Sequence, residues 1–374
     1  MPRLLPFLAV RPDVGDHVRR CSPGSPTARD RARAALERTS DDRRFSGVPS
    51  FVDIGTEVMQ RLALSVPVGI GVTVAVLAVP QERGGLVARR VRALALPAAV
   101  LVFVAALLNL SAADTGAAKV ELIGLVLTGL GLVLLWTRAS RPLAAQVAGI
   151  AAVTAFVPNA PVTKPFSLDS VAHDLLTAAH VLGMQIWTGG LTVLAVVGLV
   201  GRLRGDESDA VRATDDWTQI WQRFTLVALC SVGVMIVSGT WLAWTHVGTV
   251  GQLFTTTYGR HLAVKLVLVA LLVLAGAYNS RVLLPKIATA RRHDDHRCAF
   301  RLAVEHFPAV VLGEAVLAVA ILVLVTFLHG SARAQAGWPA ARAFDLTVLG
   351  TGVALTVVVA MALRAGRPRE KVPE

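Results

Sequence analysis

The chain has 374 residues, of which 54% are hydrophobic and only 17% are charged. This balance excludes a soluble globular domain and indicates a protein that crosses a membrane several times. The net charge of +12 does not indicate nucleic-acid binding, because most Arg and Lys residues lie in short connections between apolar runs, where they set topology and contact anionic lipid headgroups.

Residues 1–58 differ from the rest of the chain in composition. They are rich in Arg, Pro, Asp and Ser, and they lack an apolar signal region with a small-residue cleavage site. Such a segment cannot bury enough apolar surface to fold, so we predict a disordered N-terminal tail.

Nine apolar windows follow the tail, and each has roughly the length needed to cross a bilayer as a helix. They lie near residues 61–80, 94–111, 120–137, 142–157, 172–200, 224–246, 260–281, 307–328 and 344–363. The sequence therefore predicts an all-α fold, a polytopic membrane bundle of about nine transmembrane helices. Its parts are an N-terminal four-helix region (59–170), a four-helix core (171–330) and an additional C-terminal helix with a basic tail (331–374).

Positive charge alternates between the loops of this bundle. The connections at 81–92, 138–141, 201–223 and 281–297 are rich in Arg and Lys, whereas those at 111–118, 158–170 and 246–259 carry almost none. The positive-inside rule then places the C-terminus inside and the start of the first span outside. Because the Arg-rich tail would violate that rule, we favour a physiological start downstream, at Met59, over a translated tail that is tolerated as an exception.

The fifth window carries His173, His180 and Met184 in its first half. At about 100° per residue, these three side chains share one stripe of a helix. Histidine inside a membrane span is costly and usually faces a bundle interior or a cavity. Imidazole together with thioether is a ligand set suited to copper, so we expect a membrane protein that handles copper.

Five histidines fall near the outer ends of the fifth to eighth spans. They are His173, His180, His246, His261 and His329. Met235 precedes His246 by eleven residues, the same spacing that separates His173 from Met184, and this spacing keeps each pair on one helix face. Because antiparallel neighbouring helices pack as a bundle, we expect a rim of imidazoles above paired thioethers. Each histidine considered alone is also consistent with an interfacial hydrogen-bonding residue, and each methionine with a packing residue.

Three further polar residues lie within predicted spans: Lys265, Asn279 and Glu314. Lys265 stands one turn from His261, where its side chain can extend toward the interface. Glu314 lies in the inner part of the eighth span, where we expect it to serve proton or ion movement.

Four sequence blocks resemble the CopD family of bacterial copper-resistance membrane proteins. AHVLGMQIWTGGLTVL (179–194) is similar to its His-containing, Trp-x-Gly-Gly helix, and RFTLVALCSVGVMIVSGTWLAW (223–244) to its Arg-Phe-Ser and Ser/Thr-Gly helix. TTTYGRHLAVKLVLVALLVLAGAYNSRVLLP (255–285) resembles its Tyr-Gly-Arg, Leu-x-x-Lys and Asn-x-Arg signature. VLGEAVLAVAILVLVTFL (311–328) resembles its Glu-bearing last core helix.

This resemblance spans residues 170–330 and implies copper transport or copper tolerance at the cytoplasmic membrane. It also implies a separate periplasmic copper carrier of the CopC type as a partner. The residues that it singles out are His180, Trp187, Gly189, Gly190, Tyr258, Gly259, Arg260, Lys265, Asn279 and Glu314. The chain departs from the family pattern after residue 328, so the resemblance does not support His329.

Two other functions use the same residues. Facing histidines would also ligate haem b in a cytochrome-b-like redox protein, and a membrane factor for oxidase copper assembly would need the same ligands. No nucleophile elbow, phosphate-binding glycine loop or HExxH motif is present, so we expect no enzymatic activity of the hydrolase or NTPase kind.

Overall fold

A computed structural model describes residues 50–77, 86–110, 115–138, 140–159, 167–204, 210–278, 307–339 and 344–365, together with Arg281, Val282, Lys286 and Thr289. The chain divides into two units, Met1–Val48 and Pro49–Glu374, and every described residue belongs to the second. The predicted tail therefore lies outside the described residues as far as residue 49.

The first described helix, α2 (Phe51–Val72), begins inside the segment predicted to be a tail. Ser50 Oγ accepts the Asp53 N–H at 3.2 Å, and Asp53 Oδ2 accepts the Ser50 N–H at 3.1 Å. This capping box satisfies backbone donors at the helix start. The predicted boundary at residue 58 is thus too late, because a hydropathy window does not register a polar cap. The helix continues through a π-helical turn, Thr73–Leu77.

The remaining N-terminal helices are α3 (Leu86–Ala93), α4 (Ala95–Leu110), α5 (Gly116–Thr137) and α6 (Arg141–Phe156), the last followed by a short 3-10 turn at Val157–Asn159. Two helices of 37 residues come next, α7 (Leu168–Arg204) and α8 (Ala210–His246). They are followed by α9 (Gln252–Thr255), α10 (Thr257–Tyr278), α13 (Phe307–Val325), α14 (Ala332–Gln335) and α15 (Leu346–Ala365).

Six of the described helices are long and apolar enough to cross a membrane. They cover Phe51–Leu77, Val87–Leu110, Gly116–Thr137, Leu168–Val200, Gln219–His246 and Thr257–Tyr278. Three shorter apolar helices lie at Arg141–Phe156, Val310–Val325 and Leu346–Ala362. Each predicted span coincides with one of these helices, and no strand occurs in the part of the chain that the structure describes. The prediction of an all-α, multi-pass membrane protein is confirmed.

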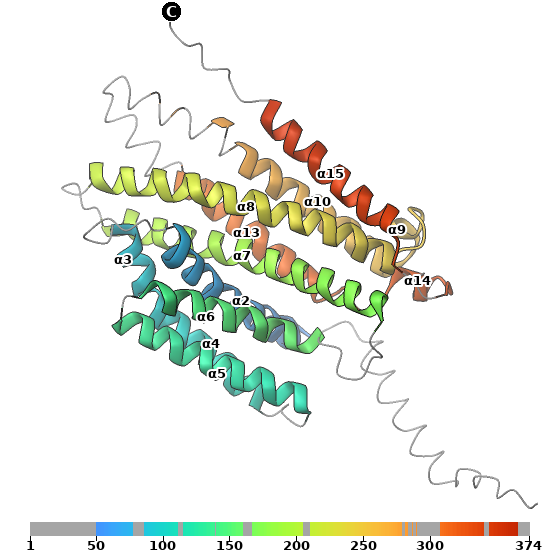
Figure 1. Cartoon of the computed structure of the whole chain (residues 1–374), viewed down its shortest axis with the longest axis horizontal. Helices are drawn as coiled ribbons and strands as arrows, with labels where there is room; N and C mark the ends of the chain where they lie inside the picture. The colour runs from blue at the N-terminus through green and yellow to red at the C-terminus, as the bar shows by residue number, and fades with distance from the viewer. Residues whose placement is uncertain are drawn as a thin grey trace, which may run out of the picture. The chain divides into compact units, whose positions relative to one another are not determined.

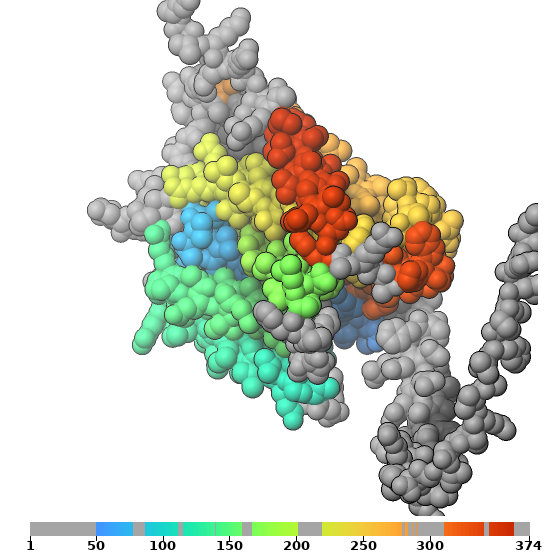
Figure 2. Space-filling view, turned by 45° about the vertical axis from the view of Figure 1, so that its right-hand side comes forward, coloured from blue at the N-terminus to red at the C-terminus, as the bar shows by residue number. Residues whose placement is uncertain are grey.

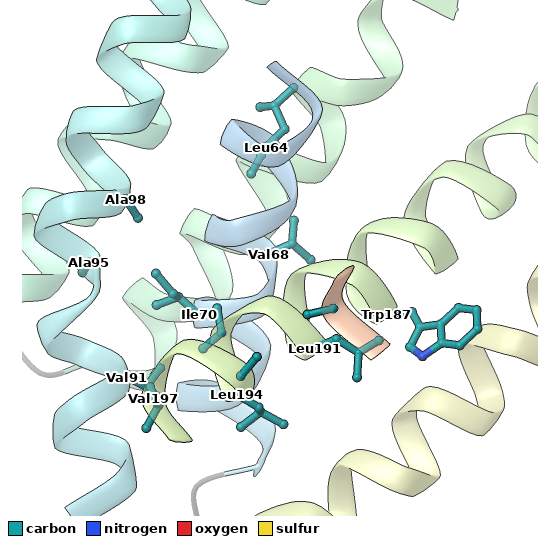
Figure 3. Close-up of a cluster of buried hydrophobic side chains, with 14 of the residues drawn as sticks. Leu64, Val68, Ile70, Val91, Ala95, Ala98, Trp187, Leu191, Leu194 and Val197 are labelled. Atoms are coloured by element: carbon teal, nitrogen blue, oxygen red, sulfur yellow. The ribbon is translucent and has the colours of Figure 1, made fainter. Parts of the chain in front are cut away.

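Helix α2 links the two halves of the bundle (Figure 1). It packs against α4 and α6 on one side and against α7 on the other. Helix α7 in turn packs against α8 and α13, and α10 packs against α13. Figure 2 shows α15 lying along the surface of α8. The core between the halves is apolar, with Leu64 and Val68 of α2 beside Leu191 and Leu194 of α7 (Figure 3).

Glycine allows α2 and α7 to cross with their backbones in contact. A β-carbon on Gly189 would lie 1.9 Å from the Ser65 carbonyl oxygen, and one on Gly69 would lie 2.3 Å from the Gly189 carbonyl carbon. Small residues at a crossing point allow this approach in membrane bundles, where close packing drives helix association. The Gly189 position of the Trp-x-Gly-Gly block thus has a structural explanation.

The short helices α9 and α14 gather at one end of the bundle, which we call the α9 end (Figure 1). There α8 ends, α10 begins, and α14 packs against both α9 and α10. The Tyr258 N–H donates to Gln335 Oε1 at 3.0 Å, which fixes α14 over the first turn of α10. The Phe344 N–H donates to Asp169 Oδ1 at 2.9 Å, so the first turn of α7 lies at this end as well.

Candidate metal site

His180 of α7 faces α8, the next helix along the chain. Its Nδ1 lies 3.1 Å from Ser238 Oγ. The Ser238 hydroxyl donates its proton to the Val234 carbonyl at 2.6 Å, so it can only accept from the imidazole. This hydrogen-bond network assigns the proton of neutral His180 to Nδ1 and leaves the lone pair on Nε2. An imidazole held in this way has its second nitrogen ready to bind a metal ion.

Met235 lies opposite the same part of α7. A β-carbon on Gly183 would lie 3.0 Å from Met235 Cγ, so Gly183 makes room for the thioether. On the facing helix, a β-carbon on Gly239 would lie 3.2 Å from His180 Cε1, so Gly239 makes room for the imidazole. Met184, which follows Gly183 on α7, is level with Met235, as antiparallel packing predicts. The α7–α8 contact therefore brings one imidazole and at least one thioether together from facing helices.

His246 and His261 lie at the α9 end in aromatic contacts. The His246 ring stacks on Tyr258, with centroids 5.8 Å apart and planes 11° apart. Its Nδ1 donates to the Leu242 carbonyl at 2.7 Å, so Nε2 carries the lone pair here too. The His261 ring packs against Phe327 with centroids 5.5 Å apart.

The predicted gathering of five imidazoles into one rim is not what the structure shows. Within the described residues, no three His, Cys, Asp or Glu side chains lie together closely enough to hold a metal ion. His180, His246 and His261 each pack against a different neighbour, namely Ser238, Tyr258 and Phe327. His329 is exposed in the turn before α14, and His173 lies in the early turns of α7. The histidines lie near the predicted ends of their helices, but their rings do not point toward one common site.

One cationic residue, Lys265, interacts electrostatically with His180. The Lys265 ammonium group of α10 is within electrostatic range of both His180 and the Arg61 guanidinium of α2. Arg61 Nη2 also pairs with Glu57 Oε1 at 2.5 Å. Positive charge therefore accompanies the imidazole inside the bundle.

Several residues of the family-like blocks support the framework. Gly190 lies against Phe224, because a β-carbon there would come within 2.3 Å of the ring. Gly259 lies against the α9 backbone, where a β-carbon would lie 2.0 Å from the Gln252 carbonyl oxygen. Tyr258 is buried between His246 and α14, whereas Arg260 is exposed. Asn279 lies outside the described residues.

A pocket of about 110 Å³ lies between α7, α8, α10 and α13, toward the end opposite α9. Trp187 and Leu191 line it from α7, on the helix face that also carries His180 and Met184. Trp187 points away from α2 toward α8 (Figure 3). Glu314, only 3% exposed, contributes a carboxyl group from α13. The pocket thus lies along the same face of α7 as His180 and Met184.

Comparison with protein families gives one match: residues 218–328 fit the model of copper resistance protein D, CopD. Residues 218–328 are thus similar to the CopD family. No curated protein and no solved structure was found to match the chain. The match confirms the predicted resemblance over residues 218–328, from within α8 to just past the end of α13. It begins after α7, so the block that carries His180 and Gly189 lies outside it.

The CopD region also contains residues that motif reading did not single out. Ser238 and Gly239 form the Ser-Gly pair of the α8 block, which orients and accommodates His180. The Ser-Gly motif of this block could have marked both residues from the sequence. Ser65 lies outside every family-like block, and Gly183 and Gln185 lie within the 179–194 block without being among the residues that the resemblance singles out.

Proposed function

We propose that this protein binds Cu(I) between α7 and α8 and moves it across the cytoplasmic membrane or sequesters it, so that the cell tolerates copper. The proposed ligands are His180 Nε2 with the thioethers of Met235 and Met184. The observation that carries the proposal is the hydrogen bond from His180 Nδ1–H to Ser238, which leaves Nε2 unprotonated.

The chemistry of these donors favours Cu(I) over harder ions. Thioether sulfur is a soft ligand, and imidazole suits copper as well. Cu(I) accepts two or three ligands, so the lack of a larger His or acidic cluster in the described residues does not weaken the proposal. Copper is the cargo here, and the protein needs no enzymatic step to handle it.

The α9 end is the proposed entrance. His246 has its Nε2 lone pair available there, and His173 and His261 lie at the same end. The distribution of Arg and Lys among the loops supports an extracytoplasmic α9 end and a cytoplasmic C-terminus. A separate carrier of the CopC type would deliver copper at this end. We leave His329 out of the proposed site, because its side chain is exposed and lies outside the α7–α8 contact.

The inner part of the path is proposed to run through the pocket beside Trp187. Glu314 would supply negative charge to a cation, or carry a proton, in that pocket. The haem b alternative needs a second imidazole facing His180, from the seventh or eighth span, whereas His261 of α10 packs against Phe327. Copper therefore has the better support.

The copper content of the purified protein tests the proposal. We expect the wild type to retain copper after desalting and His180→Ala to lose most of it. His329→Ala is the matched control, because it removes an exposed imidazole outside the proposed site, and it should retain wild-type copper. Equal copper in the wild type and in His180→Ala would remove the proposal.

A further inference from the structure

Four buried polar atoms on α2 and α7 have no hydrogen-bond partner. They are Arg61 Nε, Ser65 Oγ and both side-chain amide atoms of Gln185. Ser65 is fully buried, and Gln185 is 1% exposed. Burying one such group without a partner costs about 1–3 kcal/mol, so native proteins rarely leave several together. Within the described residues, this group of atoms calls for something that would satisfy it.

The α2–α7 crossing places the residues that carry these atoms on facing surfaces of the two helices. Gly189 lies against the Ser65 carbonyl, and Gly69 lies against the Gly189 backbone. The two helices run in roughly the same direction (Figure 1). Gln185 is one turn before Gly189 on α7 and lies on nearly the same face. Because Gly189 lies against Ser65, Gln185 lies beside the part of α2 between Arg61 and Ser65. One turn is about 5.4 Å, so the three side chains occupy one level of a tightly packed interface.

The charges around this level do not balance. Arg61 pairs with Glu57, which leaves the positive charge of Lys265 within electrostatic range of Arg61. The described residues include no ion pair for Lys265. The other nearby acid, Glu121 of α5, accepts a hydrogen bond from Gln60 Nε2, and Gln60 lies about 100° around α2 from Arg61. The Lys265 side chain is only partly exposed, and a positive charge within a membrane bundle is costly unless a negative charge accompanies it.

We propose that Arg61, Ser65, Gln185 and Lys265 bind a small inorganic anion of the chloride class inside the bundle. Arg61 Nε–H, the Ser65 hydroxyl, the Gln185 amide and the Lys265 ammonium group are all donors, and an anion accepts from every one. Gln185 Oε1 is then the acceptor for a second Lys265 proton. A water molecule would satisfy part of this set, but it would leave the positive charge of Lys265 uncompensated.

Most residues of the proposed anion site lie outside the region that matches CopD. Arg61 and Ser65 come from α2, and Gln185 comes from α7, so Lys265 is its one member within residues 218–328. The anion would also lower the repulsion that a copper cation at His180 meets from Lys265. The inference itself stands on the buried donors and does not require copper to bind.

Chloride binding to the purified full-length chain tests the proposal. The chain is exchanged into chloride-free detergent buffer, chloride is titrated in, and the chloride NMR line width is followed. We expect the wild type to broaden the line in a saturable way that bromide reverses. Lys265→Met removes the charge and should weaken binding at least about tenfold. Lys119→Met, which removes an exposed lysine near the start of α5, is the matched control and should behave as the wild type.

Two further variants keep the test decisive. Ser65→Ala removes one donor with little change in volume, so it should fold and weaken chloride binding even if Lys265→Met fails to fold. His329→Ala, which removes an exposed imidazole outside both proposed sites, should keep chloride binding unchanged. A wild type that gives no saturable broadening would overturn the proposal, and so would a folded Lys265→Met variant that binds chloride as the wild type does.

Discussion

His180 of α7 and Ser238 of α8 lie 3.1 Å apart, with the serine hydroxyl committed as a donor to its own helix. The pair therefore fixes both the orientation and the tautomer of an imidazole inside a membrane bundle. A residue that holds a ligand in this way contributes to metal affinity without touching the metal.

Replacing Ser238 tests that relationship. Ser238→Ala removes the acceptor of the His180 Nδ1 proton, so the ring can rotate or change tautomer. We expect affinity for Cu(I) to fall about 10- to 100-fold, as measured by competition with a Cu(I) chelator. Ser238→Thr keeps the hydroxyl and should restore most of the affinity. An unchanged affinity in Ser238→Ala would show that the hydrogen bond does not organise the site.

The α2–α7 crossing predicts a stability effect. Gly189→Ala places a methyl group within 1.9 Å of the Ser65 carbonyl oxygen, so the two helices must separate. We expect a clearly lower Tm in detergent, with a loss of the order of 1–3 kcal/mol or more. The control is Gly149→Ala on α6, where a β-carbon meets nothing within 4 Å. That change should leave the Tm equal or slightly higher, because Ala is the better helix former. Equal Tm values in Gly189→Ala and the wild type would contradict the close crossing.

His246 is expected to act on the rate of copper entry rather than on its retention. Its Nε2 lone pair is available at the α9 end, about two turns from Ser238 on the same helix. His246→Ala should slow copper uptake into proteoliposomes several-fold while leaving the copper content of the purified protein unchanged. Loss of retained copper would instead make His246 a ligand of the main site.

Glu314 is expected to act after the binding step. Its carboxyl group lines the pocket that continues from Trp187. Glu314→Gln keeps the shape and removes the charge, so we expect copper flux to fall at least tenfold with copper content unchanged. Glu314→Asp should keep partial flux. If Glu314→Gln kept the wild-type copper flux, the Glu314 charge would not be needed for copper to pass, and the pocket would not be part of the copper path.

The helices were predictable, and their rotations were not. Nine apolar windows correspond to nine of the described helices, because a membrane requires each span to satisfy its own backbone and expose an apolar surface. The same windows missed the start of α2 at Phe51, which depends on a cap between Ser50 and Asp53. A helix start set by two polar side chains leaves no mark in a hydropathy average.

His180 was the residue of the candidate site that the sequence predicted best. Burying a histidine deep in a membrane span costs free energy, so such a residue is expected to have a function. The partners of His180 could not be derived, because the position of a residue along a helix does not give the direction in which a packed helix turns it. His246 and His261 are at the predicted end, yet their rings pack against Tyr258 and Phe327. Likewise, no pattern in the sequence indicated that Gln185 would be buried without a partner.

X-ray absorption at the copper edge of the Cu(I)-loaded protein tests the central claim most directly. The account predicts both nitrogen and sulfur scatterers at copper in the wild type. His180→Ala should lose the nitrogen contribution, and Met235→Leu, which nearly conserves volume, should lose part of the sulfur contribution. A copper site without sulfur, or spectra that both substitutions leave unchanged, would contradict a copper site between α7 and α8.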